Sequence, residues 1–173
     1  MKKIAFLLLM AAQTLMGQAQ KKLIALSFDD GPNTTTTVHM LNVLKKHGVK
    51  ASFFVIGKNI TEESAKVMKR AHDEGHDIEN HSLTHSAMSQ LTPDSIRKEV
   101  ASTSSLVKRY VGKAPRFFRP PYINVDQKMY DNIKLGFICG EGCEDWVDSI
   151  SVDERVKRIT ASARDGLIYL LHD

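Results

Sequence analysis

Two adjacent carboxylates follow an apolar run near the start of the chain. The run 23–28 is rich in strand formers and leads directly to Asp29 and Asp30, and Gly31-Pro32 then marks a turn. Because neighbours in an extended chain face opposite ways, we expect the two acids to serve different tasks, one binding a metal ion and the other handling a proton. The alternative is turn chemistry alone, since Asp, Gly and Pro all favour turns.

Two histidines supply further candidate metal ligands. His81 and His85 are four residues apart, a spacing at which one helical turn places both imidazoles on the same face. Asp30 is the third ligand that we expect, which leaves one position open for water, as in a catalytic zinc site. Asn80 and Ser82 would orient the rings. The remaining histidines are expected to face solvent or to be structural: His39, His47, His72 and His76.

Strand and helix signals alternate along the chain. The expected strands lie at 23–28, 51–56, 76–79, 116–119, 136–139 and 167–171. The expected helices run from threonine caps at 34–37 to Gly48, and over 62–74, 93–110, 126–134 and 152–164. This alternation predicts a parallel sheet with helices outside, either open or closed into a barrel.

Chemistry in such folds gathers at the carboxyl ends of the strands. The polar residues of this chain follow that rule, because each group comes directly after an expected strand. The groups are Asp29 and Asp30, His81 and His85, 119–122, Asp145 with Trp146, and His172. We therefore expect all of them at one end of the sheet.

Five short motifs resemble, in order, those of the NodB-homology polysaccharide deacetylases, which form carbohydrate esterase family four. They are Ser-Phe-Asp-Asp-Gly-Pro at 27–32, His-Ser-Leu-Thr-His at 81–85, Arg-Pro-Pro-Tyr at 119–122, Glu-Asp-Trp at 144–146 and Leu-Leu-His-Asp at 170–173. Any one motif is weak evidence, whereas five in this order are strong. The resemblance implies an α/β fold of the distorted, incomplete (β/α) barrel type, and a divalent ion, first zinc and otherwise cobalt or another metal. It also implies hydrolysis of acetyl groups from an acetylated poly- or oligosaccharide.

The resemblance also assigns roles to residues around the metal. Asp29 would be the general base, and Asp30, His81 and His85 the metal ligands. Arg119 would pair with Asp29 and keep it ionised.

Further roles follow for the rest of the site. Tyr122 would offer its backbone N–H to the oxyanion and line the substrate site. Trp146 and Leu170 would wall the acetyl pocket, and Asp145 would tune His172, the general acid.

The chain departs from the family pattern at three places. Gly142 stands where the fourth motif usually has an Asp, and Glu141 could take over its role. Tyr169 replaces an aliphatic residue. The sequence ends at Asp173, directly after the expected acid, where family members continue through one more helix and strand, so we expect a barrel without its last unit.

The first residues resemble a secretory signal peptide. Lys2 and Lys3 precede the apolar run 4–10, and Gly17-Gln18-Ala19 has the small residues of a cleavage site. The run is too short for a membrane span. We expect residues 1–19 to be removed and 20–173 to form one secreted or periplasmic domain, a monomer without a stable membrane anchor. Without the two lysines the net charge is about +2, which is too mild to indicate nucleic-acid binding.

Two points stay open. Cys139 and Cys143 are compatible with a local disulfide in an oxidising compartment or with two free thiols, whereas a Cys-based zinc site would need a second ligand pair. Three functions also compete. The first is N-deacetylation of chitooligosaccharide or peptidoglycan. The second is O-acetyl esterase activity on xylan, and the third is glycan binding by a domain that keeps the metal and groove without turnover.

Overall fold

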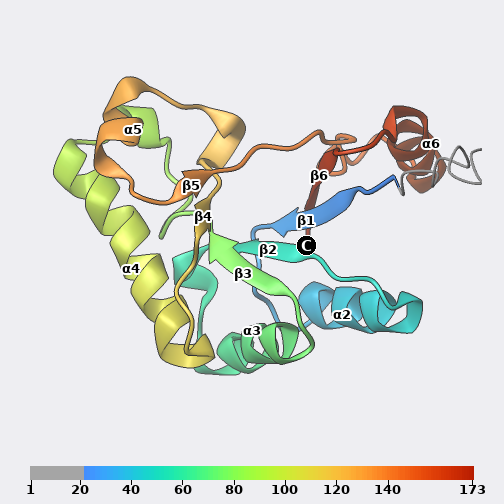
Figure 1. The fold of residues 1–173 in the computed structure, drawn as a ribbon, viewed down its shortest axis with the longest axis horizontal. Helices are drawn as coiled ribbons and strands as arrows, with labels where there is room; N and C mark the ends of the chain where they lie inside the picture. The colour runs from blue at the N-terminus through green and yellow to red at the C-terminus, as the bar shows by residue number, and fades with distance from the viewer. Residues whose placement is uncertain (1–21) are drawn as a thin grey trace, which may run out of the picture.

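The computed structural model describes residues 22–173 and shows a six-stranded parallel sheet in the order β5-β4-β3-β2-β1-β6 (Figure 1). The strands are β1 (Ala25–Asp29), β2 (Ser52–Val55), β3 (Asp77–Asn80), β4 (Phe117–Phe118), β5 (Gly136–Phe137) and β6 (Ile168–His172). The sheet curls without closing, and β5 and β6 form its edges. The predicted distorted, incomplete β/α barrel is therefore confirmed.

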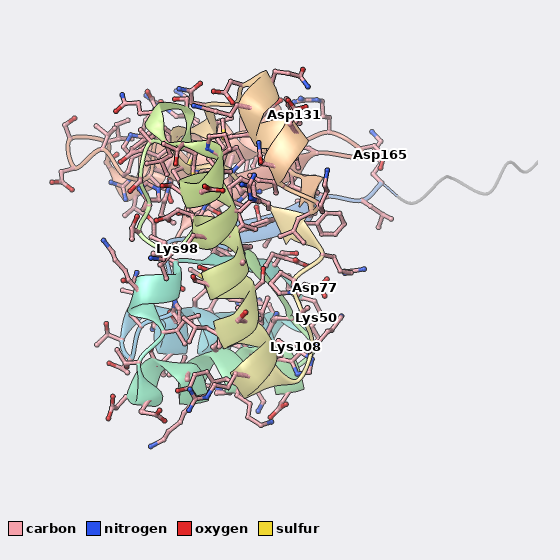
Figure 2. The ribbon with its side chains drawn as sticks, turned by 90° about the vertical axis from the view of Figure 1, so that its left-hand side faces the viewer. Lys50, Asp77, Lys98, Lys108, Asp131 and Asp165 are labelled. Atoms are coloured by element: carbon pink, nitrogen blue, oxygen red, sulfur yellow. The ribbon has the colours of Figure 1, made fainter. Side chains whose placement is uncertain are left out.

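Helices connect the successive strands of this sheet. They are α2 (Thr36–His47), α3 (Glu62–Asp73), α4 (Pro93–Val111), α5 (Gln127–Asn132) and α6 (Val152–Ser162), with short 3₁₀ turns η1 (Gly57–Asn59), η2 (Met88–Gln90) and η3 (Pro121–Ile123). The longest of them, α4, turns charged side chains such as Lys98 and Lys108 to the surface (Figure 2).

Local signals explain most helix ends. The Thr92 side chain accepts a hydrogen bond from Ser95 N–H at the start of α4, and Gly112 ends that helix in the left-handed conformation. At the start of α2, the predicted residue Thr35 occupies the cap position, but its side chain does not act as the hydrogen-bond acceptor. Asn33 takes that role, because its Oδ1 accepts the N–H groups of Thr35 and Thr37 at 2.9 and 3.1 Å.

β4 and β5 are shorter than expected, and β6 has the expected length but is shifted by one residue toward the end of the chain. β4 and β5 have two residues each, and Pro120, which has no N–H to donate to the ladder, follows Arg119 directly. β6 extends through His172, so the expected acid lies in the strand and pairs in register with Asp29.

The core consists of two clusters of buried apolar side chains. The larger one joins β1, β2 and β3 to α2, α3 and α4, with Phe53 and Val55 pointing outward from β2. The smaller one joins α4, α5 and β4 around Phe118. Because strand residues alternate, Phe54 points to the opposite face, where it contacts the functional site.

The structure also bears on the two cysteines and on the question of membrane-spanning helices. Cys139 is exposed and Cys143 is buried, and both thiols are free. None of the helices within 22–173 is long and apolar enough to cross a bilayer. The expected signal peptide, 1–19, lies outside the described residues.

Candidate active site

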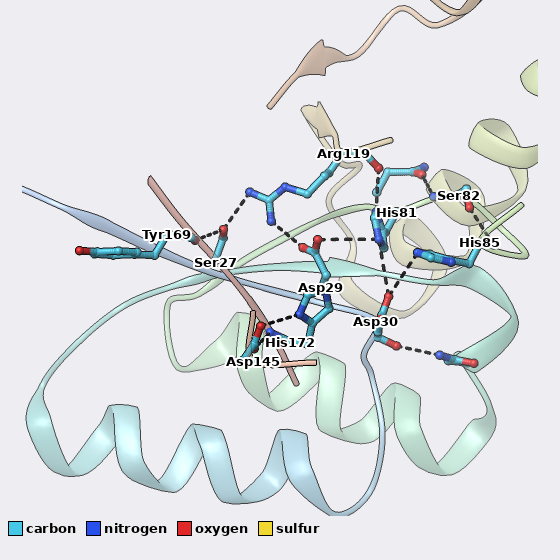
Figure 3. A network of polar contacts seen from close by, with 12 residues as sticks. Ser27, Asp29, Asp30, His81, Ser82, His85, Arg119, Asp145, Tyr169 and His172 are labelled. Atoms are coloured by element: carbon cyan, nitrogen blue, oxygen red, sulfur yellow. Dashed lines mark hydrogen bonds and ion pairs between the residues drawn. The ribbon is translucent and has the colours of Figure 1, made fainter. Parts of the chain in front are cut away.

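The carboxyl ends of the strands surround a pocket of about 490 Å³. Its wall contains the expected metal ligands and base, together with Tyr122, Trp146, Leu170 and His172. Arg119 lies behind this wall and is fully buried, and Asp145 is half-buried beside His172. The structure thus brings every predicted site residue to one end of the sheet, and Figure 3 shows the charged and histidine side chains among them.

Asp30, His81 and His85 have the geometry of a metal site. One ligand atom from each lies within 4.8 Å of the other two. Oδ1 of Asp30 is 3.6 Å from Nε2 of His81 and 3.7 Å from Nε2 of His85, and it finds no hydrogen-bond partner among the described residues. Two imidazole nitrogens and a carboxylate oxygen suit zinc and related divalent ions.

The tautomer of His81 favours metal binding. Its Nδ1 lies 2.7 Å from the backbone carbonyl of Arg119, to which it donates, so that Nε2 keeps its lone pair. Burial lowers the pKa of His81 to about 3, which keeps the ring neutral. The residues present therefore fit a divalent ion.

The predicted helical turn between the two histidines was wrong. Residues 81–85 form a loop in which Ser82 and His85 adopt left-handed backbone angles, with φ of 66° and 59°. Oδ1 of Asn80 accepts Ser82 N–H, and Oγ of Ser82 accepts His85 N–H, at 2.8 and 2.9 Å. These side-chain bonds compete with helical ones. The imidazole centroids nevertheless lie 4.9 Å apart.

The 3₁₀ turn η1 packs tightly against this loop at Gly57. Gly57 N–H donates to Ser82 C=O at 3.0 Å, and Lys58 N–H donates to Leu83 C=O at 2.9 Å. A Cβ at position 57 would meet the Thr103 hydroxyl and lie 2.8 Å from Cδ1 of Leu83.

Gly57→Ala is therefore expected to destabilise the protein by about 1–3 kcal/mol through overpacking. Thermal unfolding of the metal-free protein measures this loss directly. A melting temperature equal to that of the wild type would show that the loop and η1 can separate without cost.

Asp29 and Arg119 form a buried ion pair. Nη1 of Arg119 donates to Oδ1 of Asp29 at 2.5 Å, and Nη2 donates to Oγ of Ser27 at 2.8 Å (Figure 3). The guanidinium lies over the Phe54 ring, 4.0 Å from its centroid. Burial nevertheless raises the pKa of Asp29 to about 6, because desolvation outweighs the attraction of Arg119. The predicted pairing is present, and Arg119 lowers the pKa of Asp29 against the larger effect of burial.

The two adjacent carboxylates also converge more than predicted. Oδ2 of Asp29 and Oδ1 of Asp30 lie 3.8 and 3.6 Å from the same atom, Nε2 of His81. Asp30 has a φ of 76°, so the extended chain has already ended there and the alternation of side chains no longer holds.

Asp145 holds His172 by two contacts. Oδ1 of Asp145 lies 3.0 Å from Nδ1 of the ring, and Oδ2 accepts the backbone N–H of His172 at 2.6 Å. The hydrogen bond from Asp145 raises the pKa of His172 above its ordinary value, although burial opposes the shift. The Trp146 ring stacks edge-on against the imidazole at 5.3 Å.

Apolar groups form the rest of the pocket. Trp146 is 58% exposed and Leu170 is buried, so the indole lies at the pocket surface and not in the core. Tyr122 stands at the rim with a left-handed backbone, φ 59°, and its ring lies 4.8 Å from that of His85. Glu141 does not take over the role of the Asp expected at the position of Gly142, because Glu141 pairs with Arg164.

Two contacts near the site were not predicted. Ser27 accepts from Arg119 and donates to the Tyr169 carbonyl. The Asp173 carboxylate accepts hydrogen bonds from Asn33 and Thr37, which ties the end of β6 to the segment after Asp30. Both join residues far apart in the sequence, so no local pattern signals them.

Comparisons with known proteins identify relatives of this chain. Residues 16–137 match the family described as polysaccharide deacetylase. A bifunctional xylanase/deacetylase from Pseudobutyrivibrio xylanivorans is 44% identical over 153 residues, which cover 88% of this chain and 25% of that protein. A peptidoglycan-N-acetylglucosamine deacetylase from Bacillus cereus is 32% identical over 164 residues, which cover 93% of this chain and 59% of that protein.

A solved structure is similar as well. The family 4 acetyl xylan esterase from Clostridium thermocellum, in complex with a cobalt ion, superposes with a TM-score of 0.85 at 39% identity, covering 87% of this chain and 74% of that one. The chain spans less than two thirds of the length of either curated relative.

Proposed function

Because this chain belongs to the polysaccharide deacetylase family, we propose that it is a metal-dependent hydrolase that removes N-acetyl groups from a glycan of the chitooligosaccharide or peptidoglycan type. One observation carries this proposal. A metal-ligand triad, a buried Asp29–Arg119 pair and an Asp145–His172 pair face the same pocket. Together they supply the ligands, base and acid that hydrolysis of an acetyl group needs.

Asp30, His81 and His85 would hold the ion, with zinc as the first candidate and cobalt the ion found in a relative. When bound, such an ion lowers the pKa of water toward about 7 and polarises the acetyl carbonyl. The buried and neutral His81 and the unpaired oxygen of Asp30 are ready for this role without prior rearrangement.

Asp29 would take the proton of the attacking water. A pKa of about 6 leaves the carboxylate ionised at neutral pH, yet makes it a stronger base than an ordinary aspartate. Arg119 holds the side chain by one oxygen, Oδ1, while Oδ2 lies beside the ligand His81. The base is therefore fixed in position next to the metal ligands.

His172 would protonate the leaving group. An amide nitrogen leaves only when protonated, and the Asp145 carboxylate favours the imidazolium that donates this proton. The Tyr122 backbone N–H would stabilise the oxyanion, and Trp146 with Leu170 would enclose the acetyl methyl group.

Asp145→Asn is expected to move the alkaline limb of the pH–rate profile to lower pH. The neutral amide no longer stabilises the imidazolium, so the pKa of His172 falls toward its ordinary 6.5 and the proposed acid loses its proton earlier. The Asp145–His172 pair also stabilises the folded protein. This contribution to the free energy of unfolding is complete below pH 6.5 and is lost as the pH rises through the raised pKa of His172. Turnover measured against pH with the metal in excess checks the shift.

Asp148→Asn is the matched control, since Asp148 is an exposed carboxylate three positions further along. An unchanged alkaline limb in Asp145→Asn, or an equal shift in the control, would contradict the assignment of His172 as the acid.

A second function, O-deacetylation of xylan, is favoured by the relatives. The relatives at 44% and 39% identity are a xylanase/deacetylase and an acetyl xylan esterase, whereas the peptidoglycan deacetylase is 32% identical. The same ligands, base and acid would cleave an ester, whose alkoxide leaves more readily than an amide nitrogen.

Acetate release from N-acetylglucosamine oligomers, peptidoglycan and acetylated xylan, compared side by side, tests both functions. We expect release by the zinc-loaded protein and none after chelation, with the faster substrate deciding between amide and ester. Zinc and glycan binding without any acetate would contradict both and leave the glycan-binding function.

Location and assembly are proposed from the sequence. We propose export of the chain, guided by residues 1–19, and a monomeric domain in the secreted or periplasmic space. The N-terminal sequence of the protein recovered outside the cytoplasm, together with its mass in solution, tests this.

A further inference from the structure

The conformation of the loop that carries the two histidine ligands depends on contacts with residues outside the loop. Because residues 81–85 are not helical, the spacing of His81 and His85 does not by itself bring their rings together. Only short side-chain bonds from Asn80 and Ser82 act within the loop. Its remaining polar groups are held from outside, chiefly by α4.

Glu99, on one face of α4, holds this loop by hydrogen bonds. Oε2 of Glu99 accepts the backbone N–H groups of Leu83 and Thr84, both at 2.9 Å, and Oε1 accepts the Thr84 hydroxyl at 2.9 Å. One turn further along α4, the Thr103 hydroxyl donates to the Ser82 carbonyl at 2.9 Å. Two residues on the same face thus fix three consecutive loop residues.

These contacts act on the ligands from a distance. Neither Glu99 nor Thr103 lines the pocket, and the ligand triad consists of other residues. The residues that they hold lie between His81 and His85, so a shift of this segment would turn the His85 ring relative to Asp30. Hydrogen bonds from N–H groups to a carboxylate are among the stronger ones, because the acceptor is charged.

We propose that Glu99 is a positioning residue of the metal site, which sets the affinity for the divalent ion by holding 83–84 so that His85 faces Asp30 and His81. The proposal rests on the ligand triad of the proposed function, but not on the identity of the glycan. Without Glu99 the loop would sample other conformations. Part of the free energy of metal binding would then be used to restore the ligand geometry, so the affinity for the ion would fall.

The test is the zinc affinity of Glu99→Ala, measured on metal-free protein by competition with a chromophoric chelator. Loss of a residue that orients a ligand weakens metal binding by about 10–100-fold, and we expect a loss in this range. Glu99→Gln keeps an oxygen that can accept both backbone N–H groups but loses the charge, so its affinity should lie between those of the wild type and the alanine variant.

Two further variants complete the design. Glu63→Ala removes an exposed glutamate from α3 and should leave the zinc affinity unchanged. Thr103→Val removes one neutral hydrogen bond to the same loop and should weaken zinc binding less than Glu99→Ala does. Thermal unfolding of every metal-free variant separates an effect on the site from a general loss of stability.

A zinc affinity of Glu99→Ala within twofold of the wild type would overturn the proposal. So would a loss matched by Glu63→Ala, or one that appears only where the metal-free protein is already unfolded. Failure of the proposed function looks different: wild-type protein would bind zinc and release no acetate, while the comparison of zinc affinities would still decide the role of Glu99. A wild type that binds no zinc would refute the triad and this inference together.

Discussion

Replacement of His85 by alanine is expected to abolish binding of the divalent ion and, with it, acetate release. Nε2 of His85 lies 3.7 Å from Oδ1 of Asp30. Without His85, the described triad keeps only Asp30 and His81 as ligands. Since loss of a residue that merely orients a ligand already costs about 10–100-fold in affinity, loss of a ligand should cost more.

Zinc titration and an acetate assay on the same preparation measure both effects. His39→Ala is the matched control, because His39 is an exposed histidine on α2 and its loss should change neither quantity. If zinc content and turnover both survived in His85→Ala, the assignment of the metal ligands would be wrong.

Arg119→Met is expected to destabilise the metal-free protein by about 3–5 kcal/mol, as removal of one partner from a buried ion pair generally does. Arg119 is 0% exposed and Asp29 is 2% exposed, so the carboxylate would keep neither its partner nor access to water. The long apolar side chain of methionine fills much of the space, which leaves the unpaired charge as the main cost.

The loss should depend on pH. Burial already raises the pKa of Asp29 to about 6, above its ordinary 3.8, so protonation of this group stabilises the native state at low pH and that contribution disappears as the pH rises through 6. Removal of Arg119 raises this pKa further. Arg119→Met should therefore be penalised more at pH 8 than at pH 5, where Asp29 can be protonated.

Urea unfolding at both pH values gives the two free energies. Arg97→Met is the control, because Arg97 pairs with Asp94 through two exposed side chains, and such pairs contribute about 0–1 kcal/mol. The double variant Asp29→Leu/Arg119→Met removes both charges and should recover much of the stability. Equal losses at the two pH values, or no recovery in the double variant, would contradict the buried-charge explanation.

Much of the fold could be predicted because its signals are local. Thr92 and Gly112 mark the ends of α4 through the conformations that a cap and a left-handed residue require. The apolar run before Asp29 became β1, and the alternation of strands and helices predicted the parallel sheet. Since carboxyl ends of parallel strands share one edge, the gathering of the site residues followed as well.

The errors arose where other polar groups, near and far in the sequence, compete with a local preference. The spacing of His81 and His85 favoured a helical turn, but Asn80 and Ser82 bonded to the backbone within the loop. Glu99, on α4, which begins after the loop, stabilises the non-helical conformation of residues 81–85. No residue spacing indicates a contact of this kind, because it depends on how α4 packs against the sheet.

The sequence by itself determined which chemical groups are present: two adjacent carboxylates, two histidines four residues apart, an arginine, and an aspartate and a histidine that lie far apart in the chain. Only the tertiary structure decided their properties. β1 lies between β2 and β6, and this position buries Asp29 and raises its pKa to about 6. The end of β6 and the loop of Asp145 meet and hold His172. Desolvation and charge pairing depend on distances between elements, and those distances exist only once the chain has folded.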